Sequence, residues 1–149
     1  MSIDVTRSEG NTYKFNRQIC TRKIQSEHLL TLGLKKETAD CFLEYIGLNN
    51  YANHVWHPTV IVNNFRMPDY SKDIPAWSLH RLIEMMPSFI DIGEHSYMLS
   101  IIQGKLFSYC SDIVGNAFLY GKGNVYDSAI YTIEWLIKEG YFNKKYLEE

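Results

Sequence analysis

Two prolines bracket a short segment with helical spacing, residues 74–87 (IPAWSLHRLIEMMP). Ser78 is suited to cap a helix, because its side-chain oxygen can accept a hydrogen bond from an unpaired backbone N–H. Pro87 ends that helix, since it lacks an N–H and restricts the residue before it. Two helical turns do not persist alone in water, so the helix must pack its apolar face onto the rest of the fold. That face consists of Leu79, Leu82, Ile83 and Met86.

The longest predicted helix lies near the C-terminus. Asn124 is a suitable N-cap, and Asp127 in the first turn favours the positive end of the helix dipole. Gly140 suits the left-handed residue after the last turn, followed by Tyr141, which can contact Leu136. About 15 helical residues span about 22 Å, enough to cover a small sheet. The apolar stripe comprises Tyr126, Ala129, Ile130, Ile133, Leu136 and Ile137.

A further helix is predicted near the N-terminus, with Thr21 as its N-cap. Gly33 is suited to the left-handed position that ends it, with Leu34 reaching back to Leu29. Its predicted apolar face contains Ile24, His28 and Leu32, which are spaced by four residues. Leu29 lies beside them.

Alternating bulky residues predict antiparallel strands over residues 95–111. Gln103 and Gly104 can supply the positive φ angles of a tight hairpin between these strands. Residues 116–123 are a candidate third strand.

The middle of the chain is less regular. Residues 38–46 fit both a helix and a strand, with the strand slightly favoured; residues 49–58 read as a loop and residues 59–65 as a short strand. The order of elements predicts an α+β fold, a single domain over residues 1–149. In it, a small antiparallel sheet of three to five strands packs against two or three helices, one of them the long C-terminal helix.

The composition agrees with one folded domain. A chain of 149 residues can bury about 68–70% of its unfolded surface, and its 46% hydrophobic and 21% charged residues are ordinary values. Residues 1–12 are expected to form a flexible lead and residues 142–149 a polar tail. The N-terminus lacks the apolar stretch of a signal peptide, and no apolar run approaches the roughly 20 residues that cross a membrane.

The three cysteines are Cys20, Cys41 and Cys110. Their odd number and the lack of a C-x-x-C motif indicate no disulfide framework, which fits a reducing cytosol. We expect them to behave as small buried hydrophobic residues rather than reactive thiols.

The net charge of -2 disfavours a nucleic-acid binder that uses its whole surface, because it gives no general attraction to phosphate. A local basic patch is compatible with it. The densest positive stretch is interleaved with Tyr13 and Phe15, a mixture that single-strand binders use and that a solvated helix face also shows. The candidate nucleic-acid-binding residues are Lys14, Arg17, Arg22 and Lys23.

His54 and His57 are weak candidates for a metal site. Their spacing is loose, and no cysteine or carboxylate follows at a supporting interval. The alternative is that both are loop residues packed beside Trp56 and Pro58. No motif spacing predicts a catalytic residue or a cofactor site.

Three segments together resemble a known group of proteins: QIC-T…LLTLGL…TAD, IPAWSLHRLIEMMP and YDSAIYTIEWLIKEGY. They are similar to small uncharacterised proteins encoded in prophages and other mobile elements of gut anaerobic bacteria. The resemblance covers most of the chain from Gln18 onward. It implies the bacterial cytosol and a mobile element as the setting, and it implies no activity, catalytic residue or cofactor. The size of the chain suits a phage accessory protein.

Three functions are compatible with these observations. The first is a small non-enzymatic cytosolic protein that binds another macromolecule, either a protein partner or a second copy of itself. Its 11 tyrosines and the lack of a chemical motif favour it. The second is a nucleic-acid accessory protein that uses the basic segment from Lys14 to Lys23. The third is a small metal-assisted enzyme that uses His54 and His57.

Overall fold

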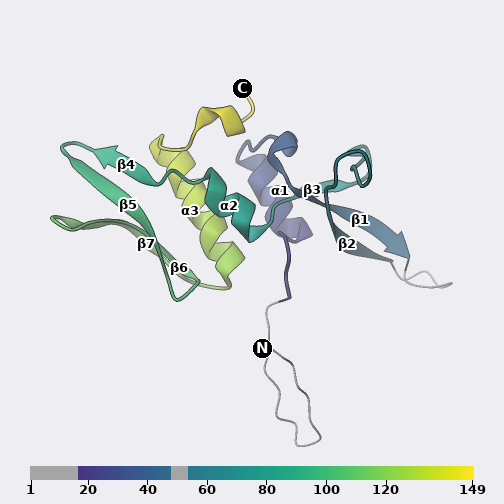
Figure 1. Ribbon diagram of the computed structural model, residues 1–149, viewed down its shortest axis with the longest axis horizontal. Helices are drawn as coiled ribbons and strands as arrows, with labels where there is room; N and C mark the ends of the chain where they lie inside the picture. Colours follow the sequence, from purple (N-terminus) through teal and green to yellow (C-terminus); the bar gives the residue numbers. More distant parts are fainter. Residues whose placement is uncertain (1–16, 48–53) are drawn as a thin grey trace, which may run out of the picture.

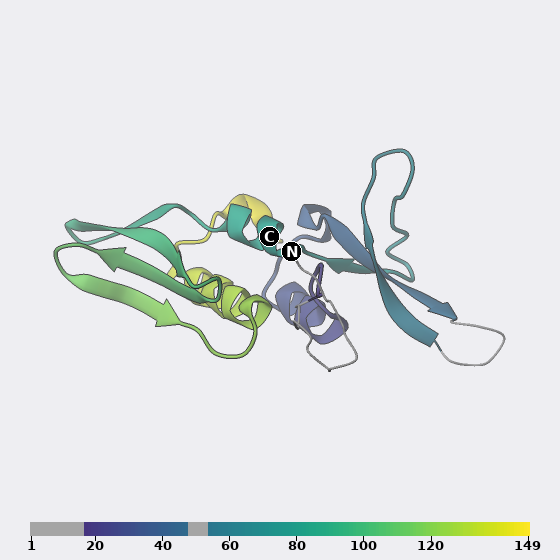
Figure 2. The same cartoon turned by 60° about the horizontal axis from the view of Figure 1, so that its bottom comes forward.

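Figure 1 shows a computed structural model of the protein, which describes residues 17–47 and 54–149. Within these residues, three α-helices lie between two antiparallel sheets, one at each end of the long axis (Figures 1 and 2). The predicted α+β class is therefore confirmed. The strands divide between a three-stranded and a four-stranded sheet, where the sequence predicted one sheet of three to five strands. None of the described helices is long and apolar enough to cross a membrane.

The three-stranded sheet has the order β2-β1-β3, with both neighbours antiparallel to the central strand. The central strand β1 follows a short 3-10 helix. It confirms the favoured prediction of a strand in residues 38–46. The expected loop at residues 49–58 is wrong from His54 onward, because β2 begins there. The elements are η1 (Lys36–Thr38), β1 (Cys41–Gly47), β2 (His54–Val60) and β3 (Ile74–Ala76).

The four-stranded sheet is a meander of consecutive strands, β4-β5-β6-β7. Gln103 (φ 52°) and Gly104 (φ 72°) form the predicted tight turn between its two central strands. The candidate third strand is also confirmed, although it ends at Tyr120, and a fourth strand joins the opposite edge. The strands are β4 (Phe89–Ile92), β5 (His95–Ile102), β6 (Leu106–Ser111) and β7 (Gly115–Tyr120).

The two helices α2 (Leu79–Met85) and α3 (Val125–Glu139) follow their predictions closely. The Ser78 side chain accepts the hydrogen bond that caps α2, and the Asn124 side chain caps α3. Gly140 has a φ of 83°, as the left-handed ending of α3 requires. Because α3 packs on β6, β7 and α2, it joins the four-stranded sheet to the centre of the molecule.

Helix α1 (Lys23–Thr31) begins later than predicted, with Arg22 as its N-cap. Thr21 is instead fully buried, and its hydroxyl hydrogen-bonds the Ser26 hydroxyl at 2.7 Å. The apolar face also differs, since Ile24 is 80% exposed. The ending matches the prediction: Gly33 has a φ of 100°, and the Leu34 N–H donates to the Leu29 carbonyl at 3.2 Å.

Among the described residues, two clusters of buried side chains form the core. The larger lies between the helices and the four-stranded sheet, and the smaller lies on the three-stranded sheet. The expected polar tail at residues 142–149 packs onto the larger cluster, because Phe142 is buried and the backbone of residues 146–148 bonds Gly33 and Lys35. The tail includes the short helix η2 (Lys144–Tyr146). The expected flexible lead at residues 1–12 lies outside the described residues.

Candidate functional site

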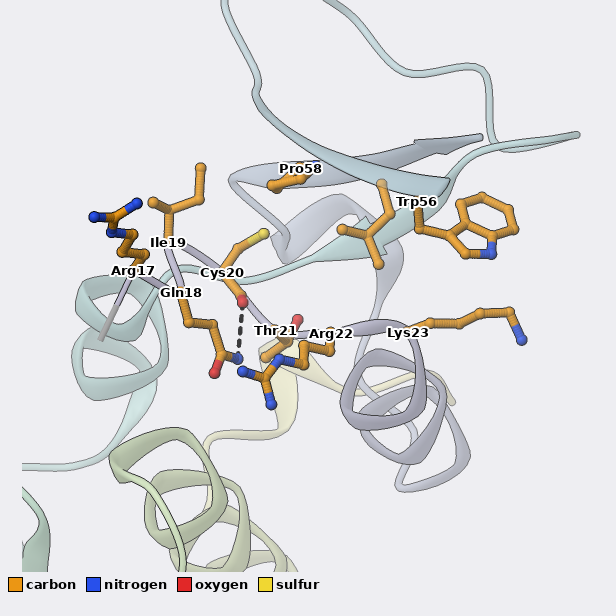
Figure 3. A pocket seen from close by; sticks show the side chains of 10 residues that line it. Arg17, Gln18, Ile19, Cys20, Thr21, Arg22, Lys23, Trp56 and Pro58 are labelled. Atoms are coloured by element: carbon orange, nitrogen blue, oxygen red, sulfur yellow. Dashed lines mark hydrogen bonds between the residues drawn. The ribbon is translucent and has the colours of Figure 1, made fainter. Parts of the chain in front are cut away.

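A cleft of about 550 Å³ lies between the segment that leads into α1 and the three-stranded sheet. Residues 17–23 form one wall, and Leu43, Trp56 and Pro58 from β1 and β2 form the other. Figure 3 shows Arg17 towards one end of the cleft, Trp56 and Lys23 towards the other, and Cys20 between them. This volume falls within the roughly 300–1,000 Å³ typical of ligand sites. We call this feature the basic cleft.

Hydrogen bonds from distant elements hold the first wall in place. The Thr21 N–H donates to the Trp77 carbonyl at 2.9 Å, and the Trp77 N–H donates to the Thr21 hydroxyl at 3.0 Å. The Tyr126 hydroxyl donates to the Gln18 carbonyl at 3.1 Å, and the Asn124 side-chain amide donates to the Gln18 side-chain oxygen at 3.2 Å. The ends of β3 and α3 therefore position residues 18–21.

Three of the four predicted nucleic-acid-binding residues line the basic cleft: Arg17, Arg22 and Lys23. Lys14 lies outside the described residues. The described lining contains no Asp or Glu, so the cleft is locally positive in a chain with a net charge of -2. The Lys23 ammonium pairs with Glu27 at 3.0 Å, an exposed i,i+4 pair that holds Lys23 only weakly. Arg22 has no ion pair with any described residue.

Aromatic rings continue from the cleft along one face of β1 and β2. The centroids of the Trp56 and Tyr45 rings are 4.9 Å apart, and those of the Tyr45 and His54 rings are also 4.9 Å apart. Alternate residues of a strand share a face, so His54 lies on the same side of β2 as Trp56 and Pro58. Tyr45 is exposed, which leaves ring surface open to a flat ligand. We call these three rings the ring row.

The sequence did not predict the ring row, because residues 49–58 read as a loop, whereas His54–Val60 form the strand β2. A proline argues against a central strand, but it is tolerated at the edge of a sheet, and β2 is an edge strand. The available signal was the alternation of His54, Trp56 and Pro58, which puts these three side chains on one face if the segment is a strand. In the structure, Tyr45 of β1 lies on that face, paired with Trp56.

His54 and His57 do not form one site. They are three residues apart in a strand, so they lie on opposite faces of the sheet. His57 is paired across the strands with Glu44, whereas His54 is paired with Gly47. Among residues 17–47 and 54–149, no group of three or more His, Cys, Asp and Glu side chains is placed to hold a metal ion.

Cys20 and Cys41 are both buried in the smaller core cluster below the cleft. The neighbouring Cys41 thiol lowers the pKa of the Cys20 thiol, against the opposing effects of burial and the Asp40 carboxylate. The neighbouring Cys20 raises the pKa of the Cys41 thiol, and burial and the Asp40 carboxylate raise it further. Burial of these two cysteines agrees with the sequence-based expectation, while Cys110 is half-buried.

A second surface lies on the four-stranded sheet, on the face turned away from α3 (Figures 1 and 2). Phe89 and Met98 are directly paired there, with 58% and 52% of their surface exposed, and Leu119 is 52% exposed. Asp91 is the one acidic or basic residue among the described strand residues on this face, and its carboxylate accepts from the Ser96 hydroxyl. We call this the outer face; its large apolar residues are Phe89, Met98, Ile102 and Leu119.

Comparison of the chain with protein-family models, with curated proteins and with solved structures gives no significant match. The basic cleft and the outer face must therefore be interpreted from their own geometry.

Proposed function

We propose that the protein binds single-stranded nucleic acid in the basic cleft. The observation that supports this proposal is the convergence of Arg17, Arg22 and Lys23 with Trp56 in one cleft whose described lining lacks a carboxylate. Cationic side chains attract backbone phosphates, and an aromatic ring stacks on any base because every base has a flat face. The proposal requires binding alone, with no catalytic group.

The ring row extends the site beyond the cleft. Tyr45 and His54 lie next to Trp56 on the same face, so a strand whose phosphates contact the cleft can place further bases along these rings. Stacking on side chains needs bases that are free of their neighbours, as they are in a single strand. A duplex keeps its bases stacked inside and would use the cations alone.

Fluorescence anisotropy with a labelled oligothymidylate of about 12 nucleotides tests the proposal. Each neutralised phosphate contributes about -0.7 to the slope of log affinity against log salt for a single strand. Three contacts predict a slope of about -2, which corresponds to roughly 20-fold weaker binding at about 200 mM salt than at about 50 mM. Lack of salt-sensitive binding near 50 mM overturns the proposal.

Two variants separate charge from stacking. We expect Arg22→Ala to weaken binding and make the salt slope shallower by about 0.7. We expect Trp56→Ala to weaken binding by about 5- to 150-fold, equivalent to about 1–3 kcal/mol, with little change in slope. Lys105→Ala is the matched control, because Lys105 is an exposed cation in the turn between β5 and β6. A loss with Lys105→Ala equal to that with Arg22→Ala would place binding elsewhere.

The outer face favours a second candidate function, protein binding, with a second copy of this chain as the partner. An almost uncharged apolar face has no complement in phosphate or in a charged peptide, but it matches itself. Two such sheets would pack face to face at about 10 Å. Sedimentation across a range of concentrations tests this: we expect a dimer that Leu119→Lys converts to a monomer. A monomer at every concentration would overturn self-association.

The setting is also part of the proposal. A cytoplasmic location is supported by the odd number of cysteines and the lack of a C-x-x-C motif. The bacterial mobile-element setting rests on the sequence resemblance alone, and the accessory role rests on the small size of the chain.

A further inference from the structure

Cys20 and Cys41 come from different elements and meet on one face of the three-stranded sheet. Cys20 lies in the segment before α1, and Cys41 is the first residue of β1. Both belong to the same buried cluster as Leu43 and Ala76. Cys41 is paired with Ala76 across β1 and β3. Trp77, which follows Ala76, is hydrogen-bonded to Thr21, which follows Cys20. The fold therefore holds the two thiols together through the end of β3.

The two thiols differ in their access to solvent. Cys20 lines the basic cleft, and Figure 3 shows its sulfur directed between the walls, near Pro58. Cys41 does not line the cleft and lies beneath it. A small oxidant that enters the cleft therefore meets Cys20 first, although this residue is only 3% exposed.

The local chemistry assigns the same order. The neighbouring Cys41 lowers the pKa of Cys20, which favours the thiolate at the cysteine that lines the cleft. Redox-sensing cysteines in general combine thiolate character, access and a neighbouring thiol that completes the reaction. Cys110 lies on the other sheet, without either cysteine beside it, and serves as an internal comparison.

We infer that Cys20 and Cys41 are an oxidation site, at which hydrogen peroxide converts the two thiols into a disulfide. The Cys20 thiolate attacks one peroxide oxygen, the O–O bond breaks, and hydroxide leaves with the Cys20 proton as water, which gives a sulfenic acid on Cys20. The Cys41 sulfur then attacks the Cys20 sulfur, the S–O bond breaks, and a second water leaves with the Cys41 proton. Two thiols are oxidised and one peroxide is reduced. This site does not depend on what the cleft binds.

The bridge would close the part of the chain that contains all of α1. Closing a loop of this length restricts the unfolded chain, so we expect the oxidised protein to have a Tm about 5–10 °C above that of the reduced protein. Reduction with dithiothreitol should restore the original Tm.

Peptide mapping by mass spectrometry, without reducing agent, tests the assignment on the full chain after peroxide treatment. The expected product is a Cys20–Cys41 cross-linked peptide, formed equally in Cys110→Ser. In Cys41→Ser, the reaction should stop at a Cys20 sulfenic acid that dimedone traps. In Cys20→Ser, Cys41 should remain a free thiol.

Three results would overturn the inference: oxidation at Cys110 with Cys20 and Cys41 intact, a cross-link between two chains, or a Cys20–Cys41 bridge that forms only in urea. The peptide map of the unsubstituted protein identifies the oxidised cysteines by itself. The test therefore does not depend on a serine variant that circular dichroism shows to be unfolded.

Discussion

The Asp40 carboxylate accepts two hydrogen bonds from Ser78, one from the backbone N–H at 2.8 Å and one from the hydroxyl. The same hydroxyl accepts the Arg81 N–H at 3.1 Å, so Ser78 both caps α2 and binds Asp40. Asp40 directly precedes β1, and Ser78 directly precedes α2. The polar contact therefore joins the three-stranded sheet to the helices at the point where both elements begin.

We expect Asp40→Ala to lower the free energy of unfolding by about 1–3 kcal/mol, because it leaves the half-buried Ser78 donors without their acceptor. Urea unfolding followed by circular dichroism measures the change. Glu94→Ala is the matched control, since Glu94 is an exposed acid in the turn between β4 and β5 and should change stability by about 0.5 kcal/mol or less. Equal effects of the two substitutions would show that the contact is not stabilising.

Leu82 and His80 test which face of α2 is buried. Leu82 is fully buried, so we expect Leu82→Ala to lower the free energy of unfolding by about 2–5 kcal/mol through lost burial and a cavity. His80 is exposed, so His80→Ala should change it by about 0.5 kcal/mol or less. Chemical denaturation of both variants provides the comparison, and the reverse order would contradict the assignment of the faces.

The helices could be predicted from sequence because their signals are local. Ser78 and Asn124 act as caps within three residues of the N–H groups they accept, and Gly33 and Gly140 end helices through their own φ angles. The hairpin turn at Gln103 is set within its own few residues in the same way. Such features do not depend on tertiary contacts with distant residues.

The failures concern contacts between distant residues. Thr21 has the right side chain for an N-cap, but its hydroxyl is bound by Ser26 and Trp77, the latter 56 residues away. Ile24 has apolar spacing, yet it is 80% exposed, because none of the described elements covers it. The division into two sheets likewise depends on which strands pair, which alternation within a strand does not specify.

The basic cleft was predictable in part. The sequence identified Arg17, Arg22 and Lys23 as a positive stretch, because they are close in the chain. It could not place Trp56 beside them, since that contact requires β2 to pair with β1 and residues 18–21 to be held by β3 and α3. The separation of His54 from His57 follows from the same unpredicted strand.

Gly140 provides a test of backbone conformation alone. Its φ is 83°, and a Cβ at this position would meet no neighbouring atom within 4 Å. We therefore expect Gly140→Ala to lower the free energy of unfolding by about 1–2 kcal/mol through the left-handed conformation alone. Gly140→Asn should cost less, because asparagine tolerates this region better. Thermal unfolding of the two variants is the measurement, and equal stability of Ala and Gly would contradict the helix ending.

Because Tyr109 is buried, we expect the protein to lose stability at alkaline pH. The Tyr109 ring is fully buried and its hydroxyl donates to the Pro87 carbonyl at 2.6 Å; burial raises the pKa of Tyr109 well above its usual value near 10. Burial, with the carboxylates of Glu37 and Asp73, likewise raises the pKa of Tyr70 to about 12. Below about pH 10 these tyrosines are protonated in both folded and unfolded states, so they add no pH dependence there.

Above about pH 10 the unfolded chain loses the Tyr109 proton while the folded protein keeps it. The free energy of unfolding should then fall by up to about 1.4 kcal/mol per pH unit for this residue. Urea unfolding between about pH 9 and pH 11 measures the slope. Tyr109→Phe removes the titrating group, so its curve should be flatter above pH 10, although the variant starts less stable because the bond to Pro87 is lost. An identical slope in the two proteins would mean that the Tyr109 hydroxyl reaches solvent in the folded state.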